Sequence, residues 1–181
     1  TTPLQLCLMT AQIANGGYRV KPKIIVNNDP LSLKDAKISM KLRSFQKPNS
    51  KLFDNPKNIK IVQEAMFSST NEQFGTSYRS RIDDPKYQFA GKTGTSQVKR
   101  ISKRERELDL KLEQIPYKDR DHALYVAYGP YKNPRYALSI IVEHGGSGSK
   151  AAAPIAKELF KLIIDRDELR DKQSNFENIN I

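Results

Sequence analysis

The chain has 181 residues, enough for one ordinary domain with a buried core, and 31 lysine and arginine residues against 20 aspartate and glutamate residues give it a net charge of +11. A single cysteine, Cys7, excludes an internal disulfide, the two histidines give no zinc-type ligand cluster, and no apolar run is long enough to cross a membrane, so we expect no metal and no other cofactor. The charge would suit a polyanion, but no basic stripe is interleaved with aromatic residues, so we expect no nucleic-acid partner.

The first predicted element is a helix. Residues 2–5, Thr-Pro-Leu-Gln, form a capping box with proline at the first helical position, and Gly16 and Gly17 end the helix. Its apolar face is formed by Leu4, Cys7, Leu8 and Ala11. Because this pattern starts at once and no signal peptide precedes it, we expect the chain to begin inside a domain.

A strand, a polar excursion and a second helix are predicted next. The strand covers residues 18–26, and Pro22 restricts it to a sheet edge or a break. Residues 27–56 are polar, basic and poorly periodic, which indicates a surface excursion. The second helix begins at Asn55-Pro56 or at Asn58. Its apolar stripe is formed by Ile59, Val62 and Met66.

The most unusual stretch is Ala-Gly-Lys-Thr-Gly-Thr-Ser at residues 90–96, where one lysine stands among glycines and small hydroxyl residues. Aromatic and β-branched neighbours favour a strand, and alternation would place Lys92 and Gly94 on one face and Thr93 and Thr95 on the other. The glycines indicate that another backbone or a ligand comes close. Taken alone, the stretch could be an ordinary surface strand. A lysine among threonine hydroxyls and exposed backbone N–H groups also suits binding of a carboxylate and stabilisation of an oxyanion.

A highly charged insertion follows at residues 99–120. Ser102 and Glu105 form a second capping box, and Pro116 ends the pattern, which predicts a short amphipathic helix between two strands. Its apolar face is formed by Leu108, Leu112 and Ile115. The insertion is either a solvated segment whose leucines pack locally or a flap or partner site beside the lysine strand.

Two strands and a closing helix complete the prediction. The strands cover residues 122–131 and 136–143 and are apolar on both faces, as is typical of central strands covered by helices above and below. Residues 144–150 form a flexible connection without the spacing of a phosphate-binding loop. The closing helix has Pro154 in its first turn and buries Ile155, Leu159 and Ile163. We therefore predict an α+β domain over residues 1–166, an antiparallel sheet covered by helices, and a polar, frayed tail over 167–181.

This order of elements resembles the C-terminal portion of the penicillin-binding transpeptidase domain, whose fold is shared with the serine β-lactamases. It is most similar to the elongation-type class B enzymes, penicillin-binding protein 2. The resemblance rests on residues 2–17, 74–76, 90–98 and 121–146, and the third of these contains the Lys-Thr-Gly motif of the penicillin-recognising serine enzymes.

The resemblance implies a peptidoglycan D,D-transpeptidase, an acyltransferase of cell-wall synthesis that penicillin inhibits. In that family a serine attacks the penultimate D-Ala carbonyl of a stem peptide, releases the terminal D-Ala and passes the acyl group to an amine of a neighbouring strand. By the resemblance, Lys92 assists proton transfer, Thr93 and Thr95 bind the carboxylate of the substrate, and the N–H of Thr95 supplies half of an oxyanion hole. The substrate would lie along residues 93–95, Gly94 included, as an added β-strand.

The family's nucleophile motif, Ser-x-x-Lys, lies far upstream of the lysine strand. Matches begin here at Ser44, Ser96 and Ser147, and none stands in the family's position. Residues 69–71, Ser-Thr-Asn, match the second motif, Ser-x-Asn, but end a helix close before the strand, so we interpret the match as chance. We therefore expect a fragment that lacks the catalytic serine and is inactive alone.

The resemblance also implies where the parent protein works and with what. It would face the periplasm from the bacterial inner membrane, anchored by an N-terminal segment outside this chain, and act in cell elongation and cell shape. Its partners would be D-Ala-D-Ala stem peptides, β-lactams, a glycosyltransferase and proteins of the elongation complex. The open alternatives are a septal class B transpeptidase, a β-lactamase-like enzyme and a non-enzymatic β-lactam sensor domain.

Overall fold

The computed structural model describes residues 1–22, 51–100 and 110–179, and the side chains of the last helix as far as Leu169. The end of the predicted strand at residues 23–26, the predicted excursion as far as residue 50, and the capping box predicted at Ser102 and Glu105 lie outside the described residues. None of the described helices is both long enough and apolar enough to pass through a lipid bilayer.

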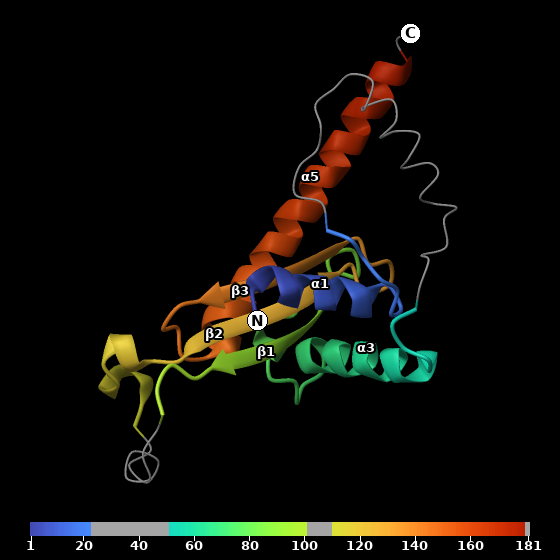
Figure 1. Ribbon diagram of the computed structural model, residues 1–181. Helices are drawn as coiled ribbons and strands as arrows, with labels where there is room; N and C mark the ends of the chain where they lie inside the picture. Colours follow the sequence, from blue (N-terminus) through green and yellow to red (C-terminus); the bar gives the residue numbers. More distant parts are fainter. Residues whose placement is uncertain (23–50, 101–109, 180–181) are drawn as a thin grey trace.

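A three-stranded antiparallel sheet forms the centre of the molecule. Strands β1 (Ala90–Ser96), β2 (His122–Gly129) and β3 (Tyr136–Val142) lie in the order β1-β2-β3. Helices α1 (Pro3–Ala14) and α3 (Pro56–Asn71) pack on one face of the sheet and α5 (Ala153–Ile179) packs on the other (Figure 1). This arrangement confirms the predicted fold class, and β2 is the central strand, as its two apolar faces predicted. The same prediction is wrong for β3, which is an edge strand of the described sheet.

The start of α1 follows the predicted local pattern. The Thr2 hydroxyl accepts the N–H of Gln5 at 3.2 Å, and the Thr2 N–H donates to the Gln5 side chain at 2.8 Å, so the capping box is confirmed. Gly16 and Gly17, both with φ near +90°, end the turn that follows the helix. Cys7 is half-buried, and its thiol donates to a β3 carbonyl, that of Ala137, at 3.3 Å.

The strand predicted from residue 18 is wrong over its described part. Tyr18 forms only an isolated bridge with Lys51, and residues 19–22 form no strand. The physical reason is local: Asn15 bonds both the N–H and the carbonyl of Tyr18, and the Gln12 side chain accepts the N–H of Val20. Side chains of α1 and its cap thus take the backbone groups that a strand would pair.

Helix α3 begins as predicted, with Asn55 as its N-cap accepting the N–H of Lys57 at 2.9 Å. The predicted stripe is wrong at Val62, which is 40% exposed. The next residue, Gln63, faces α1 instead, and its side-chain amide donates to the Ile13 carbonyl at 2.7 Å. The residues of α3 that are buried are Ile59, Met66 and Thr70.

Helix α5 begins with a different turn and a different buried face from those predicted. A π-helical turn over Gly148–Ala152 replaces the expected flexible connection. A β-carbon on Gly148 would come within 2.4 Å of the Leu124 carbonyl oxygen, so this turn lies directly on the sheet. The buried residues are Ala153, Ala156, Phe160 and Ile164, whereas the predicted Ile155 is 43% exposed. The two alanines let the helix approach the sheet closely, so small residues form part of the buried face, while the predicted Leu159 and Ile163 are only half-buried.

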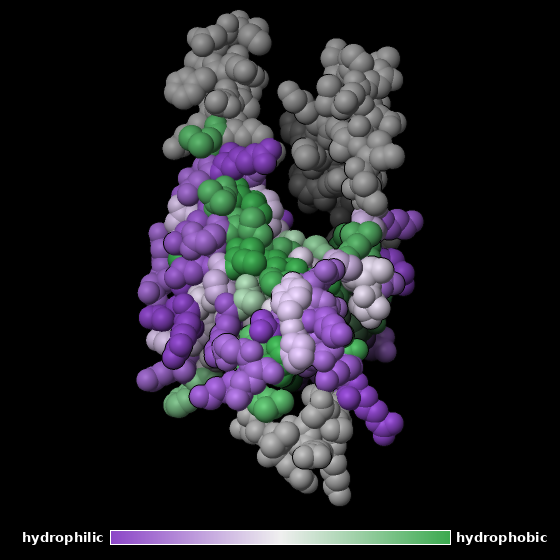
Figure 2. Space-filling view, turned by 90° about the vertical axis from the view of Figure 1, so that its left-hand side faces the viewer, coloured by the Kyte–Doolittle hydropathy of each residue, from purple (hydrophilic) through white to green (hydrophobic). Residues whose placement is uncertain are grey.

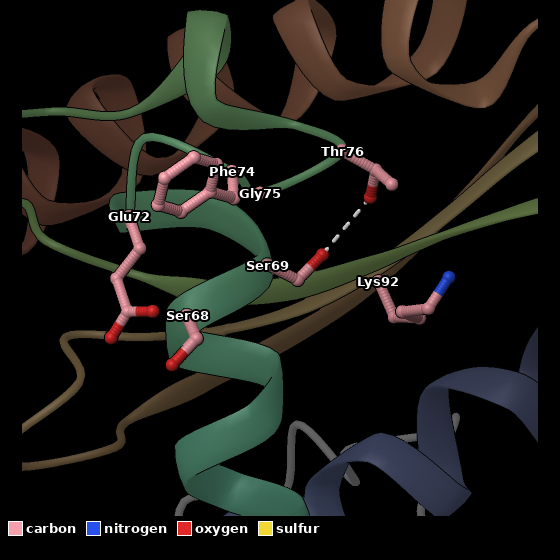
Figure 3. A pocket seen from close by; sticks show the side chains of 7 residues that line it. All are labelled: Ser68, Ser69, Glu72, Phe74, Gly75, Thr76 and Lys92. Carbon is pink, nitrogen blue, oxygen red and sulfur yellow. Dashed lines mark hydrogen bonds between the residues drawn. The ribbon is translucent and has the colours of Figure 1, made fainter.

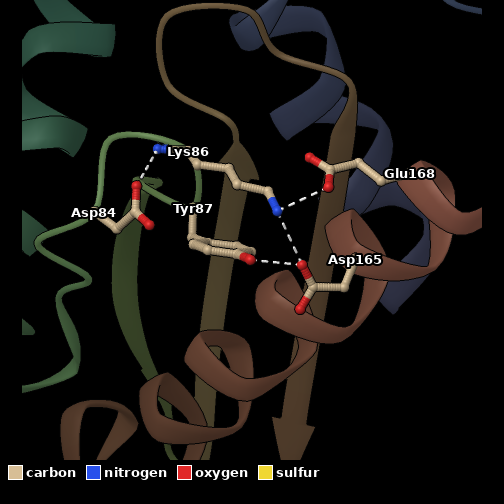
Figure 4. Close-up of polar contacts among 5 residues, drawn as sticks. All are labelled: Asp84, Lys86, Tyr87, Asp165 and Glu168. Carbon is tan, nitrogen blue, oxygen red and sulfur yellow. Dashed lines mark hydrogen bonds and ion pairs between the residues drawn. The ribbon is translucent and has the colours of Figure 1, made fainter.

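Helix α5 also extends into the tail that we expected to be frayed, as far as Ile179. Lys86 contacts Asp165 at 3.1 Å and Glu168 at 2.9 Å, and Tyr87 donates to the same Asp165 oxygen (Figure 4). The hydrogen bonds from Tyr87 and Lys86 lower the pKa of the Asp165 carboxyl. These contacts hold α5 to the segment before β1 at the point where the helix leaves the sheet.

The surface around this helix is mixed. On the face shown in Figure 2, hydrophobic side chains gather in the upper part of the coloured surface, while hydrophilic side chains cover most of the remainder. The large apolar residues of α5 that are exposed are Ile155, Leu162 and Leu169. The predicted end of the folded domain near residue 166 stays a prediction.

The described part of the charged insertion forms two short 3₁₀ turns, Leu112–Gln114 and Tyr117–Asp119. The amphipathic α-helix predicted through Leu112 and Ile115 is therefore wrong for this part. A β-carbon on Gly146 would come within 2.5 Å of Leu112, so this leucine packs against the loop after β3. Because this contact is with a loop outside the insertion, both interpretations of the insertion stay predictions.

Candidate active site

The predicted alternation along the lysine strand is confirmed by the strand register. Lys92 and Gly94 lie opposite Val126 and Leu124 of β2, whereas Thr93 and Thr95 lie opposite Tyr125 and Ala123. Side chains that are adjacent in the sequence therefore leave β1 on opposite faces. Lys92 and Thr95 are exposed, and Thr93 is half-buried.

The end of α3 covers the first half of the β1 edge. The Asn71 amide donates to the Phe89 carbonyl at 2.9 Å, and the Thr70 hydroxyl accepts the Gly91 N–H at 3.0 Å. Two residues of the Ser-x-Asn match are thus used to hold β1. That the match is chance stays a prediction.

Among the described residues, no strand pairs with the second half of the same edge. Since outward-pointing backbone groups recur every second residue of an edge strand, the N–H groups of Thr93 and Thr95 point the same way as that of Gly91. The Lys92 ammonium lies on this edge, where it donates to the Thr93 carbonyl at 2.9 Å and to the Thr93 hydroxyl at 3.3 Å. A cation, hydroxyl groups and free N–H groups on one strand edge form a binding surface for an anion or an extended peptide.

A chain of hydroxyl groups continues from this edge to α3. The Thr93 hydroxyl lies 3.3 Å from that of Thr76, which lies 3.1 Å from that of Ser69. The chain borders an open hollow of about 280 Å³ between α3 and Lys92, which we call the α3 hollow (Figure 3). The residues that line it are Ser68, Ser69, Glu72, Phe74, Gly75, Thr76 and Lys92. Phe74 is 97% exposed at its rim.

A buried hydroxyl cluster lies directly behind the strand. The Tyr125 hydroxyl is 2.9 Å from that of Thr70 and 3.0 Å from that of Ser77, and all three residues are buried. Burial raises the pKa of Tyr125, and the hydrogen bonds with Ser77 and Thr70 partly oppose this effect. The Thr70 hydroxyl of this cluster also holds the Gly91 N–H, so the cluster fixes β1 immediately before Lys92.

The two glycines of β1 have different neighbours. A β-carbon on Gly91 would lie 2.3 Å from the Tyr125 hydroxyl oxygen, so a buried side chain, not a backbone, comes close there. At Gly94 the prediction of a close backbone is confirmed, because a β-carbon on Gly148 would lie 2.8 Å from the Gly94 carbonyl oxygen. Gly91 was therefore the sequence signal for the tyrosine cluster, but it did not identify the partner.

The serines of the Ser-x-x-Lys matches are scattered. Ser96 is exposed at the end of β1, Ser147 precedes the π-helical turn with its hydroxyl 3.1 Å from that of Ser149, and Ser44 lies outside the described residues.

Among the described residues, no group of three or more His, Cys, Asp or Glu side chains could hold a metal ion.

The proteins that this chain resembles are consistent with the fold and the lysine strand described above. Residues 1–161 match the model of the penicillin binding protein transpeptidase domain. The peptidoglycan D,D-transpeptidase MrdA of Salmonella typhimurium (strain SL1344) is 31% identical over 164 residues, which are 91% of this chain and 25% of that protein. This chain thus spans about a quarter of the length of the curated relatives it matches.

Two solved structures have the same fold over most of the chain. The complex between penicillin-binding protein (PBP2) and MreC from Helicobacter pylori matches with a TM-score of 0.63 and 30% identity, over 90% of this chain and 25% of that one. Pseudomonas aeruginosa PBP2 in complex with WCK 5153 matches with a TM-score of 0.60 and 28% identity, over 90% of this chain and 30% of that one. The lysine strand, the helices on both faces of its sheet and the match over residues 1–161 lead to one conclusion: this chain belongs to the penicillin-binding protein transpeptidase domain family.

Proposed function

We propose that this chain forms the substrate-binding strand and one oxyanion donor of a serine-type peptidoglycan D,D-transpeptidase that acts in cell elongation. The observation that carries the proposal is the half-covered edge of β1. Helix α3 occupies the edge as far as Gly91 and leaves Thr93 and Thr95 open beside the Lys92 ammonium. The relatives named peptidoglycan D,D-transpeptidase MrdA support the reaction class.

The chemistry follows from this edge. A stem peptide that adds to β1 as an extra strand would bond the outward backbone groups of Thr93 and Thr95, with Gly94 between them leaving room for the substrate. Its terminal carboxylate would bind the two threonine hydroxyls and be attracted by Lys92. The N–H of Thr95 would stabilise the oxyanion of the tetrahedral intermediate, where one such donor typically contributes about 3 to 4 kcal/mol. Lys92 would assist transfer of the nucleophile's proton through its charge.

The nucleophilic serine belongs, in this proposal, to a part of the protein outside this sequence, so the chain alone is inactive. The whole protein would bind β-lactams, face the periplasm from the inner membrane and work with a glycosyltransferase. The structure of a PBP2 with MreC from Helicobacter pylori supports an MreC-like partner as well.

The test is acylation by a reporter penicillin, followed by intact-mass analysis. We expect one adduct on the full-length protein and none on residues 1–181. An adduct on this chain would contradict the missing nucleophile, and peptide mapping would then examine Ser44, Ser96 and Ser147. Absence of an adduct on the full-length protein would contradict the proposed function.

Substitution of the lysine tests its role in the same assay. Lys92→Ala in the full-length protein should lower the acylation rate about 100-fold or more, because a proton-transfer group and the carboxylate's cation are both lost. Lys132→Ala, which removes another exposed lysine of the same domain, is the matched control and should leave the rate unchanged. Full acylation of the Lys92 variant would disprove the catalytic assignment, while rapid hydrolysis of the adduct would indicate a β-lactamase-like enzyme.

A further inference from the structure

We propose that Thr76, in the loop after α3, is a positioning residue that orients the Thr93 hydroxyl to donate its proton to the substrate carboxylate. The inference rests on the proposed function, and it assigns a role to a residue outside the Lys-Thr-Gly strand. Its basis is the hydrogen-bond capacity of the hydroxyl chain from Ser69 through Thr76 to Thr93.

Within the part of the chain that the structure describes, the Thr93 hydroxyl has two polar neighbours. The Lys92 ammonium lies 3.3 Å away and can only donate, so the Thr93 oxygen accepts from it. The Thr76 hydroxyl, also 3.3 Å away, could be either donor or acceptor. A hydroxyl has two lone pairs and one proton, so the direction of this second bond decides whether the Thr93 proton is free.

The two directions have different chemical consequences. If Thr76 donates, both lone pairs of Thr93 are occupied and its proton points to the open edge, where a carboxylate can accept it. If Thr76 accepts, the Thr93 proton is used inside the protein and the carboxylate meets only a lone pair. In the first direction Ser69 donates to Thr76 across the 3.1 Å contact drawn in Figure 3. The hydroxyl chain would then run without a break from α3 through Thr93 to the substrate carboxylate.

The loop that carries Thr76 is anchored on both sides of this residue. Gly75 donates its N–H to the Glu72 carbonyl at 2.8 Å, and a β-carbon on it would lie 2.3 Å from the Ser69 carbonyl oxygen, so only glycine allows this close return. Ser77 is buried and bonds the Ser69 carbonyl through its N–H at 3.0 Å and through its hydroxyl at 3.0 Å. With fixed neighbours before and after it, Thr76 presents its hydroxyl to Thr93 without reorganisation of the loop on binding.

The experiment compares two ligands of the full-length protein: a penicillin with a free carboxylate and its methyl ester. Thr76→Val keeps the side-chain shape and removes the hydroxyl. We expect its acylation rate with the free acid to fall about tenfold, because a hydrogen bond to a charged group is lost, while the rate with the ester changes little. Thr76→Ser should restore the rate with the free acid. Ser68→Ala, which alters another hydroxyl of the α3 hollow, is the matched control.

The outcomes separate this inference from the proposed function. No acylation of the wild-type protein would overturn both. Acylation of the wild type with equal rates in Thr76→Val, or with equal losses for acid and ester, would overturn the positioning role alone. Ser69→Ala provides an independent variant at the far end of the hydroxyl chain. It should lower the acylation rate with the free acid about two- to threefold and leave the rate with the ester unchanged.

Discussion

Two clusters of hydroxyl groups, one buried and one open to solvent, are built partly from neighbouring residues of the chain. The buried cluster joins Thr70, Ser77 and Tyr125 behind β1, and the open cluster joins Ser69, Thr76 and Thr93 at its edge. They alternate along the chain, since residues 69 and 76 belong to one and residues 70 and 77 to the other. The same functional group is therefore buried in the fold in one cluster and open to solvent at the candidate site in the other.

Access to water also decides how much each cluster contributes to stability. A buried hydroxyl that loses its partner keeps its desolvation cost, which is about 1 to 3 kcal/mol. An exposed hydroxyl replaces a lost partner with water at little cost. We therefore expect substitutions in the buried cluster to change the free energy of unfolding, and substitutions in the open cluster to change ligand binding.

The largest effect is expected from Gly91→Ala, which forces a methyl group into the buried cluster. The new carbon would lie 2.3 Å from the Tyr125 hydroxyl oxygen and 2.5 Å from Cζ, so the ring must move. Overpacking costs about 1 to 3 kcal/mol, and unpaired hydroxyls add about 1 to 3 kcal/mol. Thermal unfolding of the full-length protein should show this loss together with slow penicillin acylation. Gly94→Ala, whose β-carbon would meet Leu124 Cβ at 3.3 Å, is the milder comparison.

The two clusters show which features of the fold and the site could be predicted from the sequence. The Thr2 capping box and the alternation of Lys92 and Thr93 depend on neighbouring residues, and both were predicted correctly. The buried cluster was not, because Tyr125 is 55 residues from Thr70 and 48 from Ser77, and only the folded sheet brings them together. The sequence supplied one signal, the strand glycine at position 91.

The buried faces of α5 and α3 also could not be predicted fully from the sequence. The predicted face of α5 used its large apolar residues, such as Ile155, but the face on the sheet is built around Ala153 and Ala156. How closely a helix approaches a sheet depends on the partner surface, which periodicity does not describe. In α3, Val62 was assigned to the core, although position 63 makes the contact with α1.

Thr70→Val should produce the next largest effect. It removes the hydroxyl that accepts the Gly91 N–H at 3.0 Å and bonds Tyr125 at 2.9 Å, while keeping the shape of the side chain. We expect a loss of about 1 to 3 kcal/mol in the free energy of unfolding, measured in denaturant. An unchanged midpoint would show that the buried cluster does not stabilise the strand.

Alkaline pH should weaken the buried cluster reversibly. Burial raises the pKa of Tyr125 above the ordinary value of about 10. The unfolded chain therefore loses this proton first, binds fewer protons than the folded protein, and stability falls as pH rises beyond about 10, whereas below that pH the contribution is complete. In Tyr125→Phe the decline should be shallower, although Tyr128, whose pKa burial also raises, keeps some slope.

The smallest effect on stability is expected from Ser69→Ala, one residue before Thr70. Its hydroxyl is half-buried at the open edge, and its bond to Thr76 at 3.1 Å can be replaced by a water bonded to Thr76. Alanine is also a better helix former than serine, which offsets part of any loss at the end of α3. The free energy of unfolding should therefore change by less than about 0.5 kcal/mol. If Ser69→Ala were as destabilising as Thr70→Val, access to water would not separate the two clusters, and the open hydroxyl chain would have to be assigned to the fold rather than to the substrate.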